Sequence, residues 1–301
     1  MTVPIPSEGR VLLLDKPVGP TSFDVVAAVK RGWRERRVGH TGTLDPLADG
    51  LLVVCVGEAT KLVPYLTDCD KVYEATIRLG RETRSGDLDG ETVSEVPEAA
   101  AAAIETTRIL ESFSRLTGEI EQRPPVFSAI KVDGRPLYAR ARAGEDVEAP
   151  LRQVRVDTFE LLARDGADLR VRVACGKGTY IRSLAIDVGR ALGTGGHLTA
   201  LRRTGLGTFD VGDAMTLAAF NADPESALAG ALRPADAVPW MPRHVPTPEL
   251  ALMIRQGKSP TVDWGAGRHV VLTHADTLIA IVDVDASGVL RVVRGFVEQP
   301  A

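Results

Sequence analysis

Residues 39–52 read GHTGTLDPLADGLL, and their local composition is the most unusual in the chain. Three glycines and two threonines surround Asp45, which is followed by a proline. Pro46 favours an extended backbone at Asp45, and the small residues allow another chain to approach this backbone closely. A carboxylate held in this way is suited to act as a nucleophile or a general base. Considered alone, Asp45 is explained equally well as a residue that stabilises a turn.

Apolar runs on both sides of this segment predict buried strands. The first run covers residues 9–16 and the second covers residues 51–56. Between them, Thr21 and Ser22 offer N-cap oxygens for a helix that extends to about Arg34. The aspartate-bearing segment is therefore expected to be a loop that leads into the second strand.

Patterns of apolar residues predict alternating strands and helices in the rest of the chain. The expected strands lie at 70–81, 152–163, 168–175, 269–274, 278–284 and 289–297, and the expected helices lie at 60–66, 98–117 and 179–192. The polar residues at 82–92 indicate a flexible loop, and the prolines crowded over 221–247 indicate a linker or wrapping segment. The last three strands, separated by turn signals, suggest a small all-β module at the C-terminus.

Length and composition limit the class of protein. A chain of 301 residues is expected to form about two domains. A hydrophobic content of 44% argues against a disordered chain, and the lack of a long uncharged apolar run argues against a membrane-spanning protein. The net charge of −4 does not by itself suggest a nucleic-acid partner. The charge is uneven, however, because residues 30–37 hold five basic residues and one acidic residue, whereas residues 213–301 hold 7 basic and 10 acidic residues.

The motif GHTGTLDPLADGLL resembles the catalytic motif of the TruB-type tRNA pseudouridine synthases, which isomerise uridine-55 in the T loop of tRNA. Four other segments resemble motifs of the same family and occur in the same order. These segments are LLLDKPVGPTSFDVV at 12–26, KVYEA at 71–75, GTYIRSL at 178–184 and HLTALRRT at 197–204. Together the matches extend from about residue 9 to residue 212, and five motifs in order make a coincidence improbable.

The resemblance implies a fold and a division into domains. It implies an α+β pseudouridine synthase fold with a mixed, largely antiparallel sheet, followed by a small C-terminal all-β PUA-like domain. The catalytic domain is expected at 1–240, with an insertion at about 121–149 that clamps RNA, and the RNA-binding PUA-like domain is expected at 245–301. The acidic charge of this C-terminal segment is a departure from what an RNA-binding domain needs.

The resemblance also implies roles for individual residues. Asp45 becomes the catalytic carboxylate, and Arg182 the guanidinium that keeps it ionised. Tyr73 stacks on the flipped uracil, and its hydroxyl is a candidate for proton transfer at C5. His40 fills the space that the flipped nucleotide leaves. The expected substrate-binding residues are His40, Tyr180, Leu201, Lys16, Arg202, Arg203, Lys131, Arg140 and Arg142.

The implied reaction sets the expected cofactors and partners. Breaking the N1–C1′ bond and joining C5 to C1′ is an isomerisation, so no cofactor and no metal are expected. The expected partner is the T-stem loop of tRNA, with no guide RNA, no obligatory protein partner and no membrane. The three cysteines, an odd number without a CxxC pair, and the lack of a secretory signal at the N-terminus favour the cytoplasm.

Two other functions are compatible with parts of this pattern. One is an RNA chaperone or structural tRNA-binding protein that folds tRNA without turnover. The other is the dyskerin-like branch, which shares the TLDP motif but works with guide RNA and protein partners. The combination of Asp45, Tyr73 and Arg182 favours catalysis, and the short chain with its 121–149 insertion favours a stand-alone enzyme.

Overall fold

The structure is a computed structural model that describes residues 5–128, 131–132, 134–137, 140, 145, 149–273 and 276–296. The chain divides into two compact units. The first comprises Met1–Pro46, Leu51–Thr67 and Asp213–Ala301, and the second comprises Leu47–Gly50 and Asp68–Gly212. Strand β3 (Ala48–Val56) belongs to both units, because its first three residues lie in the second unit and the others lie in the first.

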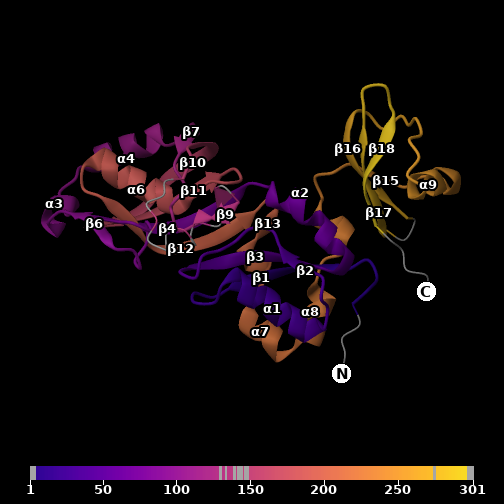
Figure 1. Ribbon diagram of the computed structural model, residues 1–301, viewed down its shortest axis with the longest axis horizontal. Coiled ribbons are helices and arrows are strands. Elements are labelled where there is room, and N and C mark those ends of the chain that lie inside the picture. The colour runs from indigo at the N-terminus through magenta and orange to yellow at the C-terminus, as the bar shows by residue number, and fades with distance from the viewer. Residues whose placement is uncertain are drawn as a thin grey trace. The chain divides into compact units, whose positions relative to one another are not determined.

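The first unit contains the N-terminal strand and helix and the segments that pack against them (Figure 1). Its part of the large sheet has the order β14-β1-β3, with β2 also paired to β3. Trp33 at the end of α1 is buried, donates a hydrogen bond to the carbonyl of Pro224 (2.6 Å) and contacts the edge of Phe220. The elements are β1 (Arg10–Lys16), α1 (Ser22–Trp33), β2 (Val38–His40), η1 (Gly57–Leu62), α2 (Val63–Thr67), β14 (Met215–Thr216), α7 (Leu217–Ala222), α8 (Pro224–Gly230) and η3 (Pro234–Ala237).

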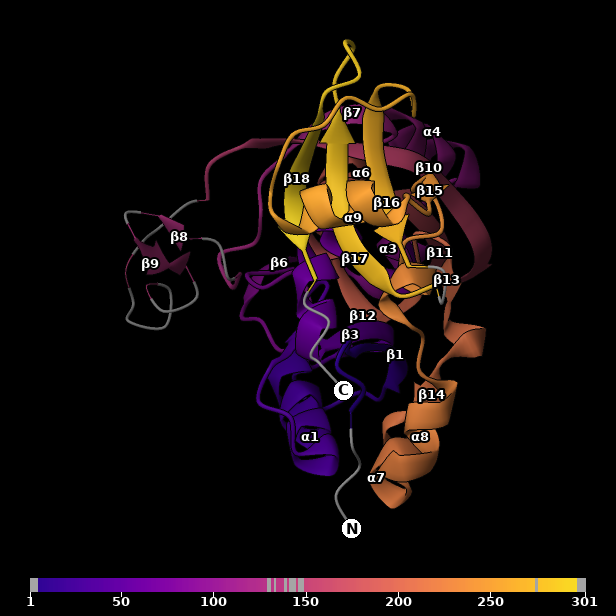
Figure 2. The same cartoon turned by 90° about the vertical axis from the view of Figure 1, so that its right-hand side faces the viewer.

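A separate four-stranded sheet follows near the C-terminus, with the order β15-β16-β17-β18. Helix α9 (Pro248–Arg255) lies across this sheet (Figure 2), and Ile254 belongs to the same buried cluster as Val271 and Val282. The small C-terminal sheet predicted from the sequence is confirmed, whereas the helix on it was not predicted. The strands are β15 (Arg243–His244), β16 (Gly267–Leu272), β17 (Leu278–Val284) and β18 (Leu290–Gly295).

The second unit is built on the rest of the large sheet, in the order β3-β12-β4-β11-β10-β7, with β13 paired to β12. The pairings from β12 to β7 are antiparallel, and β12 runs parallel to β3. The predicted α+β class with a mixed, largely antiparallel sheet is therefore confirmed. The elements are β4 (Lys71–Leu79), β5 (Arg81–Thr83), β6 (Thr92–Glu95), α3 (Glu98–Ala102), α4 (Thr106–Arg115), β7 (Gly118–Gln122), β8 (Lys131–Val132), β9 (Arg135–Pro136), β10 (Arg152–Asp165), β11 (Asp168–Cys175), α6 (Ile181–Leu192), β12 (Gly196–Leu206), β13 (Phe209–Asp210) and η2 (Val211–Asp213).

The single helix predicted over 98–117 is wrong, because two short helices, α3 and α4, occupy this stretch. Each helix packs against a different part of the unit. Ala101 of α3 lies beside Gly80, whereas Phe113 of α4 stacks on Phe159 of β10. The helix propensity of alanine is a small contribution to the free energy, so packing at these two sites decides where the helices begin and end. The linker predicted over 221–247 is also wrong in part, since it contains α8 and η3.

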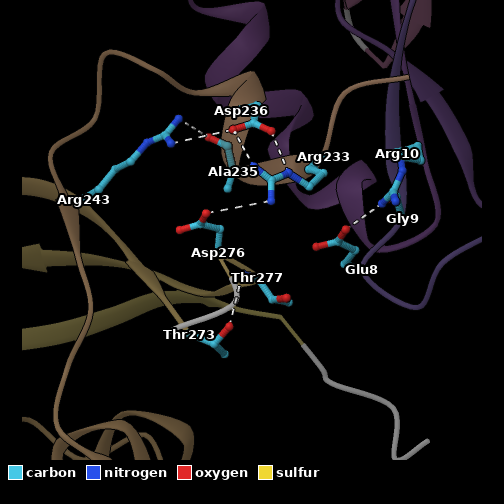
Figure 3. A network of polar contacts seen from close by, with 10 residues as sticks. All are labelled: Glu8, Gly9, Arg10, Arg233, Ala235, Asp236, Arg243, Thr273, Asp276 and Thr277. Atoms are coloured by element: carbon cyan, nitrogen blue, oxygen red, sulfur yellow. Dashed lines mark hydrogen bonds and ion pairs between the residues drawn. The ribbon is translucent and has the colours of Figure 1, made fainter. Parts of the chain in front are cut away.

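A network of charged side chains ties η3 to the start of the C-terminal sheet (Figure 3). Asp236 accepts from Arg233 (2.8 Å) and lies 3.7 Å from a guanidinium nitrogen of Arg243. Arg243 also donates to the carbonyl of Ala235 (3.0 Å), and Arg233 reaches Asp276, which precedes β17. Asp236 is thus the shared ion-pair partner of two arginines, one on either side of the connection.

Replacing Asp236→Asn is expected to loosen this connection, because two partly exposed ion pairs lose their shared charge. Each such pair contributes about 0–1 kcal/mol, so trypsin is expected to cleave after Arg243 about two- to fivefold faster. Time courses of limited proteolysis measure this rate. Glu225→Gln, which neutralises an exposed carboxylate of α8, serves as the matched control. Equal cleavage rates in the two variants would show that Asp236 does not hold the connection.

Candidate active site

The loop that carries Asp45 is held on both sides of the aspartate. The Leu44 amide donates to the hydroxyl of Ser22 (2.9 Å), and this hydroxyl lies 3.2 Å from the Leu44 carbonyl, which it can reach as a donor. On the other side, the amide of Gly19 donates to the carbonyl of Pro46 (2.8 Å). Ser22 and Leu44 are buried, whereas Asp45 is half-buried. The backbone of the loop is therefore fixed while the aspartate remains accessible.

His40 lies at the end of β2, five residues before Asp45. Its Nδ1 accepts a hydrogen bond from the amide of Gly42 (3.2 Å), so this nitrogen carries no proton in that bond. The imidazole is half-buried and stands edge-on to the ring of Phe23, with 6.0 Å between the ring centroids. The histidine is thus oriented by its own loop and by the first turn of α1.

The basic residues that flank helix α1 fall into two groups. Lys16 is completely buried, and its ammonium donates to the carbonyls of Pro17 (2.9 Å) and Pro20 (2.8 Å). It therefore braces the turn that precedes α1. The second group is exposed, lies at the C-terminal end of α1 and beyond it, and comprises Lys30, Arg31, Arg34, Arg36 and Arg37. The basic run seen in the sequence is an exposed surface of the protein.

In the second unit, Tyr73 lies on β4 opposite Arg203 of β12 and Val173 of β11. Tyr73 is half-buried, whereas Arg203 is 1% exposed. Gly50 allows β3 to approach β12 at this point, since a Cβ atom there would lie 2.3 Å from the carbonyl oxygen of Arg203. The lack of a side chain at Gly50 thus lets two strands of this chain lie close together.

The other predicted residues of β12 lie next to Arg203. Leu201 is buried and pairs in register with Ala48 of β3. The guanidinium of Arg202 forms an ion pair with Asp49 (2.7 Å). Arg202 thus meets a carboxylate of the motif segment itself.

The start of α6 is held by Gln122 at the end of β7. The Gln122 side chain accepts from the amide of Tyr180 (2.8 Å) and donates to its carbonyl (3.1 Å). Two residues later, the Arg182 guanidinium donates to the carbonyls of Ser85 (2.9 Å) and Phe127 (2.9 Å). Arg182 is only 4% exposed, so its position is set by the backbone around it.

Asp87 lies close to Arg182 and was not among the predicted site residues. The carboxylate of Asp87 lies 3.8 Å from the Arg182 guanidinium and accepts a hydrogen bond from the hydroxyl of Ser85. The backbone carbonyl of Asp87 accepts a hydrogen bond from the hydroxyl of Thr83 (2.7 Å). The flexible loop predicted over 82–92 is therefore a hydrogen-bonded turn with buried side chains. The sequence TRSGDLDG at 83–90 is rich in Thr, Ser, Asp and Gly, and residues of these types form such turns, so the turn could have been predicted.

The 121–149 segment begins beside α6. Arg123 donates to the carbonyl of Ala149 (2.8 Å) and accepts from the hydroxyl of Ser183 (2.7 Å) through its own carbonyl. Arg140 forms an ion pair with Glu145 (2.7 Å). Of the other predicted contacts, Lys131 lies on β8 without a described side chain, and Arg142 lies outside the described residues.

Among the residues that the structure describes, no group of three or more His, Cys, Asp or Glu side chains is placed to hold a metal ion. In the same part of the chain, no helix is long and apolar enough to cross a membrane. None of the three cysteines, all of which the structure describes, forms a disulfide bond. Burial raises the pKa of Cys55 to about 12 and that of Cys175 to about 11, so these two thiols are not nucleophiles at neutral pH.

Comparison with known families gives two matches that together span residues 30–238. Residues 30–181 match the N-terminal domain of the TruB family pseudouridylate synthases. Residues 182–238 match the C-terminal domain of tRNA pseudouridylate synthase B.

Similar proteins include several named tRNA pseudouridine synthase B. The one from Aromatoleum aromaticum is 45% identical over 284 residues, which cover 93% of this chain and 90% of that protein. The one from Leifsonia xyli subsp. xyli is 50% identical over 232 residues, or 76% of each chain. The one from Bordetella pertussis is 50% identical over 216 residues, which cover 72% of this chain and 88% of that protein.

Solved structures that are similar to nearly the whole chain include two that contain H/ACA or Cbf5 proteins. One is a chain of an H/ACA RNP bound to a substrate RNA containing 2′-deoxyuridine, with a TM-score of 0.72 and 25% identity, covering 97% of this chain and 86% of that chain. The other is a chain of a Cbf5-Nop10-Gar1 complex, with a TM-score of 0.71 and 27% identity, covering 98% of this chain and 89% of that chain.

Asp187 lies on α6, the helix that carries Arg182. Burial raises the pKa of its carboxyl to about 6; Glu82 acts in the same direction and Arg190 opposes it. Because the unfolded chain has a pKa of about 3.9 here, the folded state binds the proton more tightly. The charged carboxylate therefore destabilises the fold, and stability is lost as the pH rises from about 4 through about 6.

Replacing Asp187→Asn is expected to raise the free energy of unfolding at pH 8 by about 1–2 kcal/mol. The gain should shrink towards zero at about pH 3, where the wild-type carboxyl is protonated in both states. Urea denaturation at the two pH values measures this, with Asp165→Asn on the exposed end of β10 as the control. A gain of the same size at both pH values would contradict the account.

Proposed function

Because the chain belongs to the TruB family of pseudouridylate synthases, we propose that it converts uridine-55 in the T loop of tRNA into pseudouridine. The observation that carries this proposal is the loop of Asp45. Hydrogen bonds at Leu44 and Pro46 hold its backbone, and the carboxylate between them is accessible. A fixed, accessible carboxylate is what an isomerisation at a glycosidic bond requires.

The proposed reaction needs no net oxidation. The N1–C1′ bond breaks, the uracil rotates, and C5 bonds to C1′, while one proton leaves C5 and one is gained at N1. Asp45 supplies the carboxylate that acts at the uridine, and Arg182 keeps that carboxylate ionised. The carbonyls of Ser85 and Phe127 support this role because they fix the direction of the guanidinium. Tyr73 stacks on the uracil.

The proposal requires the uridine to leave the stack of the RNA, since a base that stays stacked and paired does not present its glycosidic bond to the half-buried carboxylate of Asp45. His40 fills the space that the nucleotide leaves. The exposed basic residues after α1 hold phosphates. Residues 121–149 close over the RNA as a clamp, and residues 245–301 form an RNA-binding module attached to a catalytic domain at 1–240.

The degree of similarity favours a tRNA enzyme over a guide-dependent one. The relatives named tRNA pseudouridine synthase B are 45–50% identical to this chain, whereas the H/ACA chains are 25–27% identical. A tRNA-binding protein without turnover would not need a positioned carboxylate. Incubating the purified protein with an unmodified tRNA transcript and no guide RNA tests the proposal, and a T loop without pseudouridine would overturn it.

The replacement Asp45→Asn is expected to abolish turnover and to change the Kd for tRNA less than about threefold. The amide keeps the shape of the side chain but lacks the charge for the chemistry, whereas phosphate contacts supply most of the affinity. Single-turnover formation of pseudouridine and filter binding measure the two quantities. Glu160→Gln, an exposed residue of β10, is the control. Residual turnover near the wild-type rate, or affinity lost in parallel with activity, would contradict the assignment.

A further inference from the structure

We propose that Phe23 is a stacking platform for an unpaired base of the RNA, next to the nucleotide that enters the active site. The inference rests on the proposed function, because it requires an RNA substrate at this loop. Phe23 is the second residue of α1 and lies in the motif segment at 12–26.

The position of Phe23 relative to the loop of Asp45 is fixed on both sides. Thr21 and Asp24 form a capping box, in which each side chain accepts a hydrogen bond from the other residue's amide. Between them, Ser22 is hydrogen-bonded to Leu44. Phe23 therefore follows directly after Ser22, and Asp45 follows directly after Leu44, the residue that is hydrogen-bonded to Ser22.

The ring of Phe23 is not needed for packing of the helix. The buried residues of α1 are Ser22, Val25, Val26, Ala28, Val29 and Trp33. Phe23 is 74% exposed, which is the highest value for a large apolar side chain in the part of the chain that the structure describes. Its one described ring contact is the edge-on pair with His40. A large aromatic surface is thus presented to solvent beside the motif residue His40.

The chemistry around α1 favours RNA as the occupant. An exposed aromatic ring stacks well on an unpaired base, and the cations that begin with Lys30 and Arg31 at the other end of the helix bind phosphates. Lys30 lies seven residues after Phe23, or about 10 Å along the helix. Flipping one base removes a stacking partner from its neighbours. A ring held beside the entry point replaces that partner.

Three variants and one control test the inference. Phe23→Ala removes the ring, Phe23→Leu keeps apolar surface without a π-face, and Phe23→Tyr restores the ring. Val18→Ala removes another exposed apolar side chain (63%), from the turn that precedes α1, and is the matched control. Binding is measured with an unmodified tRNA transcript, and with a fully paired RNA duplex that offers no unpaired base.

Phe23→Ala and Phe23→Leu are expected to weaken binding of the tRNA by about 5- to 150-fold. Phe23→Tyr is expected to stay within about twofold of the wild type, and all proteins should bind the duplex equally. Stacking quenches the fluorescence of 2-aminopurine. With this base placed beside uridine-55, the fluorescence should fall when the RNA binds the wild type and should fall less when it binds the Phe23→Leu variant. Equal tRNA affinities for wild type, Phe23→Ala and Phe23→Leu would overturn the inference, as would a loss that extends to the duplex.

Pseudouridine formation by the wild type, measured in the same samples, separates this inference from the proposed function. If the wild type forms pseudouridine and the ring is dispensable for binding, only the role of Phe23 fails. If the wild type forms none on tRNA, the proposed function fails, and the stacking role fails with it.

Discussion

The contacts between Ser22 and Leu44 connect the first helix to the loop of the candidate catalytic aspartate. The serine hydroxyl is buried, so both contacts form away from water, where an unpaired backbone amide or carbonyl is costly. The helix is fixed in turn by Trp33, which is buried at its far end. The orientation of Asp45 thus depends on packing that begins a full helix away.

The second unit uses the same physical means to hold its site residues. Arg182 is directed by two backbone carbonyls, and the start of its helix is held by the side chain of Gln122. In both units, the groups proposed for chemistry lie on backbone that is hydrogen-bonded to distant parts of the chain. Strand β3, which both units share, follows the loop of Asp45 directly and contains Gly50, where only a glycine fits against β12.

The sequence predicted the parts of the fold in which one signal dominates. The strand at 9–16 and the helix after Thr21 are found as β1 and α1 because continuous apolar patterning and a capping residue act locally. The broken helix over 98–117 was missed because its two halves pack against different neighbours, which no local pattern encodes. The turn around Asp87 was missed for a similar reason, since its polar residues are buried by segments far away in the sequence.

For the candidate site, the sequence identified residues but not their environments. The basic run after α1 is exposed, as a phosphate-binding surface requires, whereas Lys16 and Arg203 are buried. The ammonium of Lys16 donates to two carbonyls of the turn that follows it. Charge in a sequence does not reveal burial, because long side chains reach carbonyls or carboxylates several residues away. The roles proposed for these residues therefore stay predictions.

The central claim is that Ser22 fixes the backbone next to Asp45, and amide hydrogen exchange at Leu44 tests it most directly. In Ser22→Ala, the Leu44 amide loses its acceptor, so its exchange is expected to accelerate at least about tenfold. The amide of Thr41, which donates to the carbonyl of Val53 (3.1 Å), should exchange as in the wild type. An unchanged exchange rate at Leu44 would contradict the account, because it would show that the loop is held without the serine.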